Sequence, residues 1–140
     1  MKQIKKQKQS GFTLIEIMVV IVILGVLAGL IVPNVIGKDD QARVTAVKSD
    51  IKAISNSLEL FKLDNFRYPS TEEGLEGLVN KPDNAPNFAP GGYLKKLPKD
   101  PWGGEYGYLN DGSSYELYSF GSDGAEGGEG YASDISSSEL

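Results

Sequence analysis

An uninterrupted apolar run near the start of the chain constrains its fold more than any other feature. Residues 17–32 are all apolar or glycine, and no charged side chain follows until Lys38. At a rise of about 1.5 Å per residue, roughly 20 uncharged residues in a helix reach about the thickness of a hydrocarbon core. The basic residues before the run predict that the C-terminal body lies outside the cytoplasm, because cytoplasmic flanks prefer Lys and Arg. These residues are Lys2, Lys5, Lys6 and Lys8.

A secretory signal peptide is the alternative interpretation of this start. Such a peptide also has a basic head and an apolar core, but its small-residue cleavage site follows the core. Here Gly25 and Gly29 lie within the run, whereas Ser10 and Gly11 form a small-residue pair before it. Cleavage after Gly11 would remove the lysines and keep the hydrophobic segment, which would then begin at Phe12.

Glu16 is the only charged residue between Gly11 and Lys38. A charge inside a membrane segment costs up to about 3 kcal/mol, so it is usually paired or functional. If the chain begins at Phe12, a neighbouring copy could present its α-amino group to Glu16. That pairing would neutralise both charges and set the stagger between copies. The alternative is a carboxylate near the membrane surface without a partner.

A second apolar pattern, with helical spacing, follows the run. Six apolar residues recur at alternating intervals of three and four, which defines one stripe of an amphipathic helix. Pro33 lacks an amide hydrogen and predicts a kink. We therefore expect one helix, bent at Pro33, from about Phe12 to about Asp64. The stripe consists of Val44, Val47, Ile51, Ile54, Leu58 and Phe61.

The remaining sequence predicts a small α+β domain. Ser70 and Glu73 have capping-box spacing before a short apolar face, so we expect a brief helix over residues 71–79. Residues 80–104 are dense in Pro, Gly and Asn and predict an ordered loop. The runs EYGYL and YELYSF flank NDGSS, which is a hairpin signal. A sheet of a few antiparallel strands would then cover the helix stripe. The loop residues expected in the core are Tyr93, Leu94 and Trp102.

Composition excludes several classes of function. The chain contains no cysteine or histidine, which excludes disulfides, thiol or histidine catalysis, and zinc sites built from these residues. It has 14 basic and 19 acidic residues, and part of the basic set lies in the N-terminal segment before the apolar run. An acidic body does not suggest a partner such as nucleic acid. No serine lies in a G-x-S-x-G context, and we expect no enzyme active site.

The final loop, FGSDGAEGGEGYASD, combines acids with glycines that let backbone carbonyls turn inward. Calcium prefers six to eight oxygen ligands of this mixed kind. The ligand spacing of an EF-hand is absent. The residues alone leave two alternatives, a calcium site and a solvated acidic loop. The acids are Asp123, Glu126, Glu129 and Asp134.

The segment KQSGFTLIEIMVVIVILGVLAGLIVPN resembles the leader and N-terminal helix of type IV pilins and pseudopilins. The matching positions are Gly11, Phe12, Thr13 and Glu16. The resemblance implies that a prepilin peptidase cuts between Gly11 and Phe12 and methylates the new N-terminal phenylalanine. It also implies that Phe12, Thr13 and Glu16 act in filament assembly. A proline is common in this family at the position of Pro33.

Three later segments sharpen the resemblance. RYPSTEEGLEGLV, GGYLKKLPKDPWGGEYGYL and YELYSFGSDG together resemble the major pseudopilins of the type II secretion system. Type IV pilins usually close their C-terminal region with a disulfide, which this chain cannot form. The resemblance implies a type IV pilin-like α+β fold in three parts. These are a cleaved leader at 1–11, a transmembrane and filament-core helix at 12–37, and a periplasmic head at 38–140.

The implied function is that of a main structural subunit. It would polymerise in the periplasm into a pseudopilus that drives export of folded proteins through the outer membrane. The implied partners are other copies of the chain, the prepilin peptidase, an inner-membrane assembly platform and minor pseudopilins. The implied location is the bacterial inner membrane, crossed once. The alternatives are a type IV pilus subunit for adhesion or motility, and a membrane-anchored periplasmic binding module.

The same resemblance implies that the final loop binds calcium. The positions that match the family's two ligating aspartates are Asp123 and Asp134, and Phe120 matches a carbonyl ligand. Glu126 and Glu129 have no matching role. The family often ends with a tryptophan soon after the second aspartate, whereas this chain ends SDISSSEL. The packing of this tail is therefore not implied by the resemblance.

Overall fold

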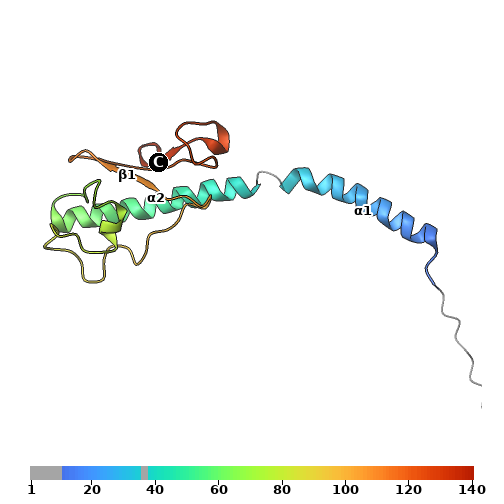
Figure 1. Cartoon of the computed structure of the whole chain (residues 1–140), viewed down its shortest axis with the longest axis horizontal. Helices are drawn as coiled ribbons and strands as arrows, with labels where there is room; N and C mark the ends of the chain where they lie inside the picture. Colours follow the sequence, from blue (N-terminus) through green and yellow to red (C-terminus); the bar gives the residue numbers. More distant parts are fainter. Residues whose placement is uncertain (1–10, 36–37) are drawn as a thin grey trace, which may run out of the picture. The chain divides into compact units, whose positions relative to one another are not determined.

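The computed structural model describes residues 11–35 and 38–140, and its contacts divide the chain into two units that meet between Lys38 and Asp39. The first unit contains helix α1 (Leu14–Val35) (Figure 1). The second unit, the head, contains helix α2 (Lys38–Asn65) and a small sheet. Its short 3-10 helices are η1 (Leu75–Leu78), η2 (Gly130–Ala132) and η3 (Ser137–Glu139).

Helix α1 is apolar on every side. Its large apolar side chains through Leu27 are all exposed, from 47% at Ile17 to 81% at Leu14. The helix continues past Pro33 to Val35, and residues 36 and 37 lie outside the described residues. The kink at Pro33 therefore stays a prediction. Within residues 11–35 and 38–140, none of the helices combines the length and the hydropathy that a membrane crossing requires.

Helix α2 carries the predicted stripe, which forms the base of the head's core. Five of its six residues are buried and Val44 is half-buried. Leu78 and Leu117, which are fully buried, belong to the same cluster. The predicted loop residues Tyr93, Leu94 and Trp102 pack against it. The amphipathic pattern thus located the core correctly.

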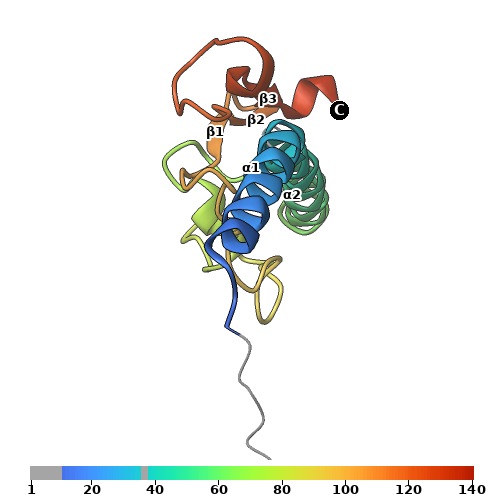
Figure 2. The same cartoon turned by 90° about the vertical axis from the view of Figure 1, so that its right-hand side faces the viewer.

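The sheet consists of three antiparallel strands on one side of α2 (Figures 1 and 2). The predicted hairpin is confirmed as β1 (Gly107–Asn110) and β2 (Tyr115–Ser119). A third strand, β3 (Ile135–Ser136), pairs with the end of β2. Ile135 packs against the core, and the Ser137 hydroxyl accepts a hydrogen bond from the Leu117 amide at 3.2 Å. The atypical tail therefore completes the sheet.

The helix predicted over residues 71–79 is wrong. The capping box does form, because the Glu73 amide donates to Ser70 Oγ at 3.1 Å and the Ser70 amide donates to Glu73 Oε2 at 2.7 Å. However, only a turn and η1 follow it. Gly74 has φ +58° and ψ −164°, a backbone conformation that a helix cannot contain. Gly74 therefore stops the helix that Ser70 and Glu73 would start.

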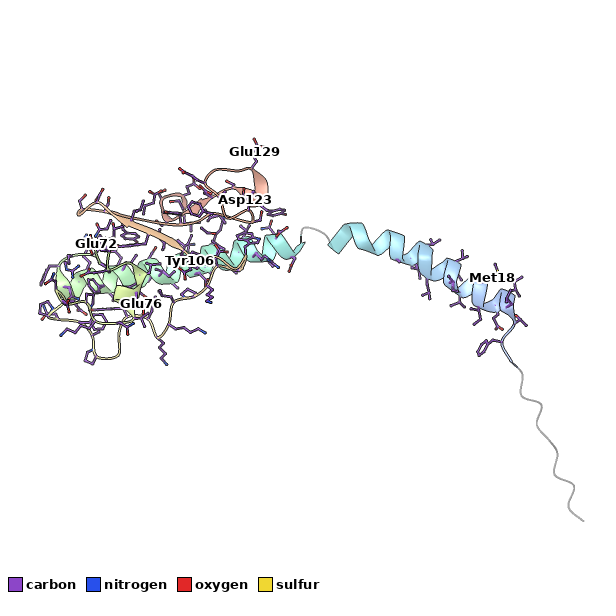
Figure 3. The ribbon with its side chains drawn as sticks, in the orientation of Figure 1. Met18, Glu72, Glu76, Tyr106, Asp123 and Glu129 are labelled. Atoms are coloured by element: carbon purple, nitrogen blue, oxygen red, sulfur yellow. The ribbon has the colours of Figure 1, made fainter. Side chains whose placement is uncertain are left out.

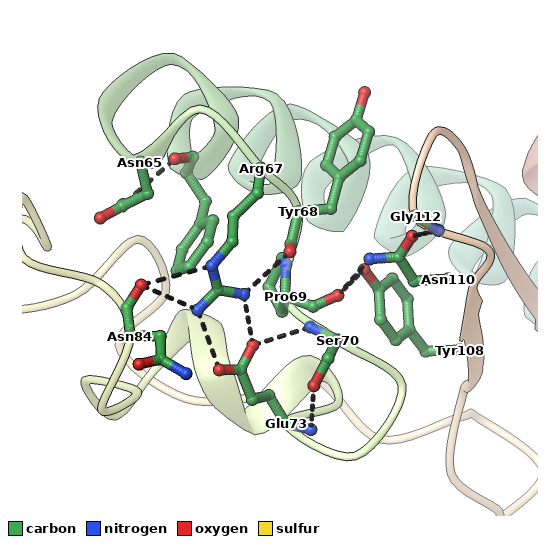
Figure 4. A network of polar contacts seen from close by, with 11 residues as sticks. Asn65, Arg67, Tyr68, Pro69, Ser70, Glu73, Asn84, Tyr108, Asn110 and Gly112 are labelled. Carbon is green, nitrogen blue, oxygen red and sulfur yellow. Dashed lines mark hydrogen bonds and ion pairs between the residues drawn. The ribbon is translucent and has the colours of Figure 1, made fainter.

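Arg67 organises the segment that follows α2 (Figure 4). Its guanidinium forms a two-pronged ion pair with Glu73, with distances of 2.6 and 2.9 Å, and donates to the carbonyls of Asn84 and Tyr68. This hydrogen bonding raises the pKa of Arg67 and lowers the pKa of Glu73. The pair is only partly exposed and links residues near 67, 73 and 84.

Buried tyrosines of the head each find an acceptor. Tyr68 donates to Glu59 at 2.8 Å, Tyr106 donates to Asp50 at 2.7 Å, and Tyr108 donates to the Pro69 carbonyl. Burial, together with the hydrogen bond to Glu59, raises the pKa of Tyr68 to about 12. Burial raises the pKa of Tyr106 further, with the Asp50 bond as the next cause. These phenols therefore stay protonated and remain donors at neutral pH.

Candidate functional site

The predicted processing and assembly residues lie at the exposed start of α1. An added Cβ at Gly11 would meet nothing within 4 Å, and Phe12 is 80% exposed. The Thr13 hydroxyl accepts a hydrogen bond from the Glu16 amide at 3.3 Å. Thr13 thus caps the helix, and Glu16 lies in the first turn, where a negative charge interacts favourably with the helix dipole. This local role is compatible with the predicted pairing of Glu16.

The second candidate is the acidic loop, residues 120–134, which joins β2 to β3. Its backbone turns through glycines and is tied by hydrogen bonds such as that from the Ser122 amide to the Tyr131 carbonyl at 2.9 Å. A Cβ added at Gly121 would lie 2.7 and 2.8 Å from the carbonyl oxygens of Ser133 and Tyr131. These carbonyls therefore crowd the start of the loop. The glycines with positive φ are Gly121, Gly124, Gly127, Gly128 and Gly130.

Asp123 is exposed and lies on the first half of the acidic loop (Figure 3). Its Oδ1 accepts a hydrogen bond from the Ala125 amide at 3.0 Å. Asp123 also lines a hollow of about 310 Å³, together with Phe120, Asp100 and Glu105. The hollow is therefore strongly acidic.

Asp134 lies at the other end of the loop, directly before β3. Its Oδ2 accepts a hydrogen bond from the Gly127 amide at 3.0 Å. Its Oδ1 is buried and has no hydrogen-bond partner among the residues that the structure describes. A buried carboxylate oxygen without a donor is costly, and a bound cation would satisfy it. Asp134 lines a second hollow with Glu126 and Phe120, so Phe120 borders both hollows.

Asp123 and Asp134 line different hollows, with Phe120 bordering both, so the structure does not bring the two predicted aspartates together at one hollow. Their oxygens are of the kind that a hard cation takes. In the described ranges, no three acidic side chains converge on one point, so carbonyl oxygens would have to complete the shell. Two aspartates, with carbonyls such as those crowding Gly121, form the all-oxygen mixture that calcium prefers. The soft or nitrogen ligands that favour transition metals are missing because the chain has no Cys or His.

Two residues beside the loop were missed by the sequence reasoning. Asp100 is 5% exposed and Ser119 is fully buried, and the Ser119 hydroxyl donates to Asp100 Oδ2. Ser119 Oγ also accepts from the Gly121 amide at 3.2 Å, and Asp100 Oδ1 accepts from the Trp102 amide at 2.9 Å. Asp before Pro is an ordinary turn signal, and nothing in the local pattern indicates that Asp100 is buried against β2.

Comparison with known proteins places the chain in a family. The family model described as "Type II secretion system (T2SS), protein G" matches residues 34–138. The "Prokaryotic N-terminal methylation motif" matches residues 6–32. The "Type II secretion system core protein G" of Pseudomonas aeruginosa is 57% identical over 136 residues, which cover 94% of this chain and 96% of that protein. The Vibrio cholerae protein of the same name is 50% identical over 94% of this chain and 92% of its own length.

Solved structures agree with this assignment. The crystal structure of the major pseudopilin from the type 2 secretion system of enterohaemorrhagic Escherichia coli is 41% identical. The match has a TM-score of 0.66 and covers 77% of this chain and 96% of that one. The predicted pilin-like α+β fold is confirmed, and the chain belongs to the protein G family of the type II secretion system, the family of the major pseudopilin.

Proposed function

We propose that the chain is the main structural subunit of a type II secretion pseudopilus. It polymerises in the periplasm and drives export of folded proteins through the outer membrane. The observation that carries this proposal is the agreement of two matches, protein G over residues 34–138 and the methylation motif over residues 6–32. A structural subunit needs no active site of its own, and we expect no enzymatic activity.

The physical support comes from α1. A helix that is apolar on every side is stable only when other apolar groups cover it. In the membrane, lipid chains cover α1 of the single subunit. In the filament, the α1 helices of neighbouring copies cover one another. We infer that the subunit crosses the inner membrane once, with its head in the periplasm, until the assembly platform and the minor pseudopilins recruit it. This inference rests on the apolar run of residues 17–32 in the sequence, since the described part of α1 does not by itself meet the length and hydropathy of a crossing.

Processing creates the group that Glu16 needs. Cleavage by the prepilin peptidase between Gly11 and Phe12 frees an α-amino group, and methylation keeps that group basic. The amine of one copy then pairs with Glu16 of the next and fixes the axial stagger, while Thr13 holds the first turn.

The test compares Glu16→Ala with Glu72→Ala, a control at an exposed acid of the head. We expect Glu16→Ala to leave the subunit inserted in the membrane but to abolish pseudopili and secretion. Removal of a charge from an apolar segment eases insertion, so targeting cannot explain that loss. Wild-type filament yield from Glu16→Ala would refute the pairing.

Intact mass should show a methylated N-terminus at Phe12, and retention of Met1 would refute processing.

We also propose that the acidic loop binds calcium through Asp123 and Asp134, with the Phe120 carbonyl as a further ligand. Bound calcium would supply positive charge to two aspartates that border separate hollows, both lined by Phe120. The partnerless Oδ1 of Asp134 supports this assignment.

Calorimetric titration of the full chain in detergent micelles with calcium tests the site. We expect one bound ion and a melting midpoint that rises with calcium. Asp123→Ala and Asp134→Ala should abolish both effects, whereas Glu129→Ala should retain them because Glu129 is not a proposed ligand. An unchanged wild-type midpoint and no binding heat would show that the loop is only a solvated acidic surface.

A further inference from the structure

A short turn, Asp100–Gly104, joins the acidic loop to the rest of the head. Asp100 closes the turn on itself, because its amide donates to the Gly104 carbonyl at 3.2 Å and its carbonyl accepts from the Gly103 amide at 2.8 Å. The turn and the loop face each other across the hollow of about 310 Å³ that Asp100, Trp102 and Asp123 help to line.

The other side of the turn is fixed to helix α2. The Trp102 indole donates to Asp40 Oδ1 at 3.2 Å, and the Arg43 guanidinium donates to the Pro101 carbonyl at 3.3 Å. Trp102 also packs against the core cluster. The turn is therefore an anchored support, whereas the acidic loop has only one buried residue, Gly121.

A relay of hydrogen bonds with a defined direction runs from this support into the loop. The Ser119 hydroxyl donates to Asp100 Oδ2. The lone pairs of Ser119 Oγ are then turned to the Gly121 amide, which donates to them. Gly121 is the residue against which the carbonyls of Tyr131 and Ser133 are packed.

We propose that Asp100 and Ser119 are positioning residues of the calcium site: they hold Gly121, and through it the facing carbonyls, in the conformation that accepts the ion. This inference rests on the proposed calcium site. Neither residue contacts the ion. Both act through the backbone of the acidic loop, as partners behind metal ligands commonly do.

The experiment measures calcium affinity of the full chain in detergent micelles for wild type, Ser119→Ala and Asp100→Asn. Ser119→Ala removes the relay. Asp100→Asn keeps the shape but leaves one acceptor oxygen, so the side chain can no longer accept from both the Ser119 hydroxyl and the Trp102 amide. We expect each variant to weaken calcium binding by about tenfold to a hundredfold, the usual effect of losing a partner behind a metal ligand.

The matched control is Tyr68→Phe, which also removes a hydroxyl that donates to a carboxylate, that of Glu59 on α2, outside the acidic loop and the Asp100–Gly104 turn. It should lower the melting midpoint without changing calcium affinity. Hydrogen exchange in calcium should be faster at the amides of residues 121–134 in Ser119→Ala and unchanged there in Tyr68→Phe.

Two outcomes would overturn the inference, and they are distinguishable. If wild type binds calcium and both variants bind it equally well, Asp100 and Ser119 are only structural and the proposed site stands. If wild type binds no calcium, the proposed site fails and this inference fails with it.

Discussion

Two long connections in the head are held in place by different interactions. The first, residues 66–106, joins α2 to β1 and the second, the acidic loop, joins β2 to β3. The first places many apolar side chains in the core or against it and carries the ion pair of Arg67 and Glu73. All residues of the second are described, and its only buried residue is Gly121. The buried residues of the first are Tyr68, Pro69, Leu75, Gly77, Leu78, Pro82, Ala85, Asp100 and Tyr106.

The difference shows that a long connection with little regular secondary structure can be ordered by two different means. Apolar burial stabilises the first connection and is insensitive to ions. Backbone turns and a few hydrogen bonds order the second, which removes little apolar surface from water. A loop of the second kind has low local stability unless a ligand is bound.

Leu78→Ala should produce the largest effect, because it attacks the burial that holds the first connection. Leu78 is fully buried in the core. A buried Leu→Ala change costs about 3–5 kcal/mol of unfolding free energy, from lost transfer energy and the cavity left behind. Tyr131→Ala in the acidic loop should cost less than about 1 kcal/mol because Tyr131 is exposed. Urea unfolding of both variants measures the contrast, and equal losses would contradict it.

Removal of calcium should loosen the acidic loop alone. If the proposed site binds calcium, a hundredfold excess over Kd would stabilise the bound state by about 2.7 kcal/mol. With chelator, hydrogen exchange should accelerate at residues 121–134. The Tyr93 amide, which donates to the Leu78 carbonyl at 2.8 Å, should keep its protection. Equal acceleration in both connections would mean that they open as one unit.

Glu73→Gln should weaken the first connection by about 1.5 kcal/mol, the lower end for hydrogen bonds to charged groups, because the pair is partly exposed. The matched control is Asp39→Asn, which breaks the more exposed pair with Arg43 and should cost less than about 0.5 kcal/mol. Chemical denaturation gives both values, and a cost for Asp39→Asn as large as that for Glu73→Gln would contradict the ranking.

The Glu73 pair should also respond to pH. The pKa of Glu73 is lowered in the folded head, chiefly by the hydrogen bond from Arg67, from an ordinary value of 4.5. The pair therefore contributes fully above pH 4.5, and its contribution is lost as pH falls through the lower folded pKa. The stability difference between wild type and Glu73→Gln should shrink over that acid range and stay constant from pH 6 to 8. A constant difference down to strongly acidic pH would contradict this assignment.

Phe66→Gly should give the smallest effect, a gain in stability. Phe66 follows α2 with φ +60°, a left-handed conformation that costs about 1–2 kcal/mol for a non-glycine residue. Its side chain is 85% exposed, so its loss removes little buried surface. Glycine loses more backbone entropy on folding than phenylalanine, which offsets part of this relief. We therefore expect a net gain of about 0.5 kcal/mol in the free energy of unfolding. A loss of stability on urea unfolding would show that the Phe66 side chain contributes to the fold.

Local patterns predicted the elements whose signals lie close together in sequence. The stripe from Val47 to Phe61 gave α2 and the core because a helix repeats its buried face every three or four residues. The hairpin followed from a turn flanked by aromatic runs. The leader motif identified the candidate processing residues, and the matches over residues 6–32 and 34–138 bear out the family that the motifs suggested.

Two other elements were not predicted. Ser70 and Glu73 signalled a helix, but the backbone conformation of Gly74 stops it, and only η1 follows. The tail read as a polar end, yet it forms β3 because the edge of β2 was open to pairing.

The sequence by itself determined the helical stripe that forms the core, the hairpin and the motifs of the family. The stripe and the hairpin are each encoded by residues that lie within a few turns or one strand pair of each other. Only the tertiary structure decided that Asp134 has a buried oxygen without a partner among the described residues, and that Asp100 lies against Ser119, 19 residues away. Burial and hydrogen bonding between distant segments depend on how the whole head packs, and no local pattern carries that information.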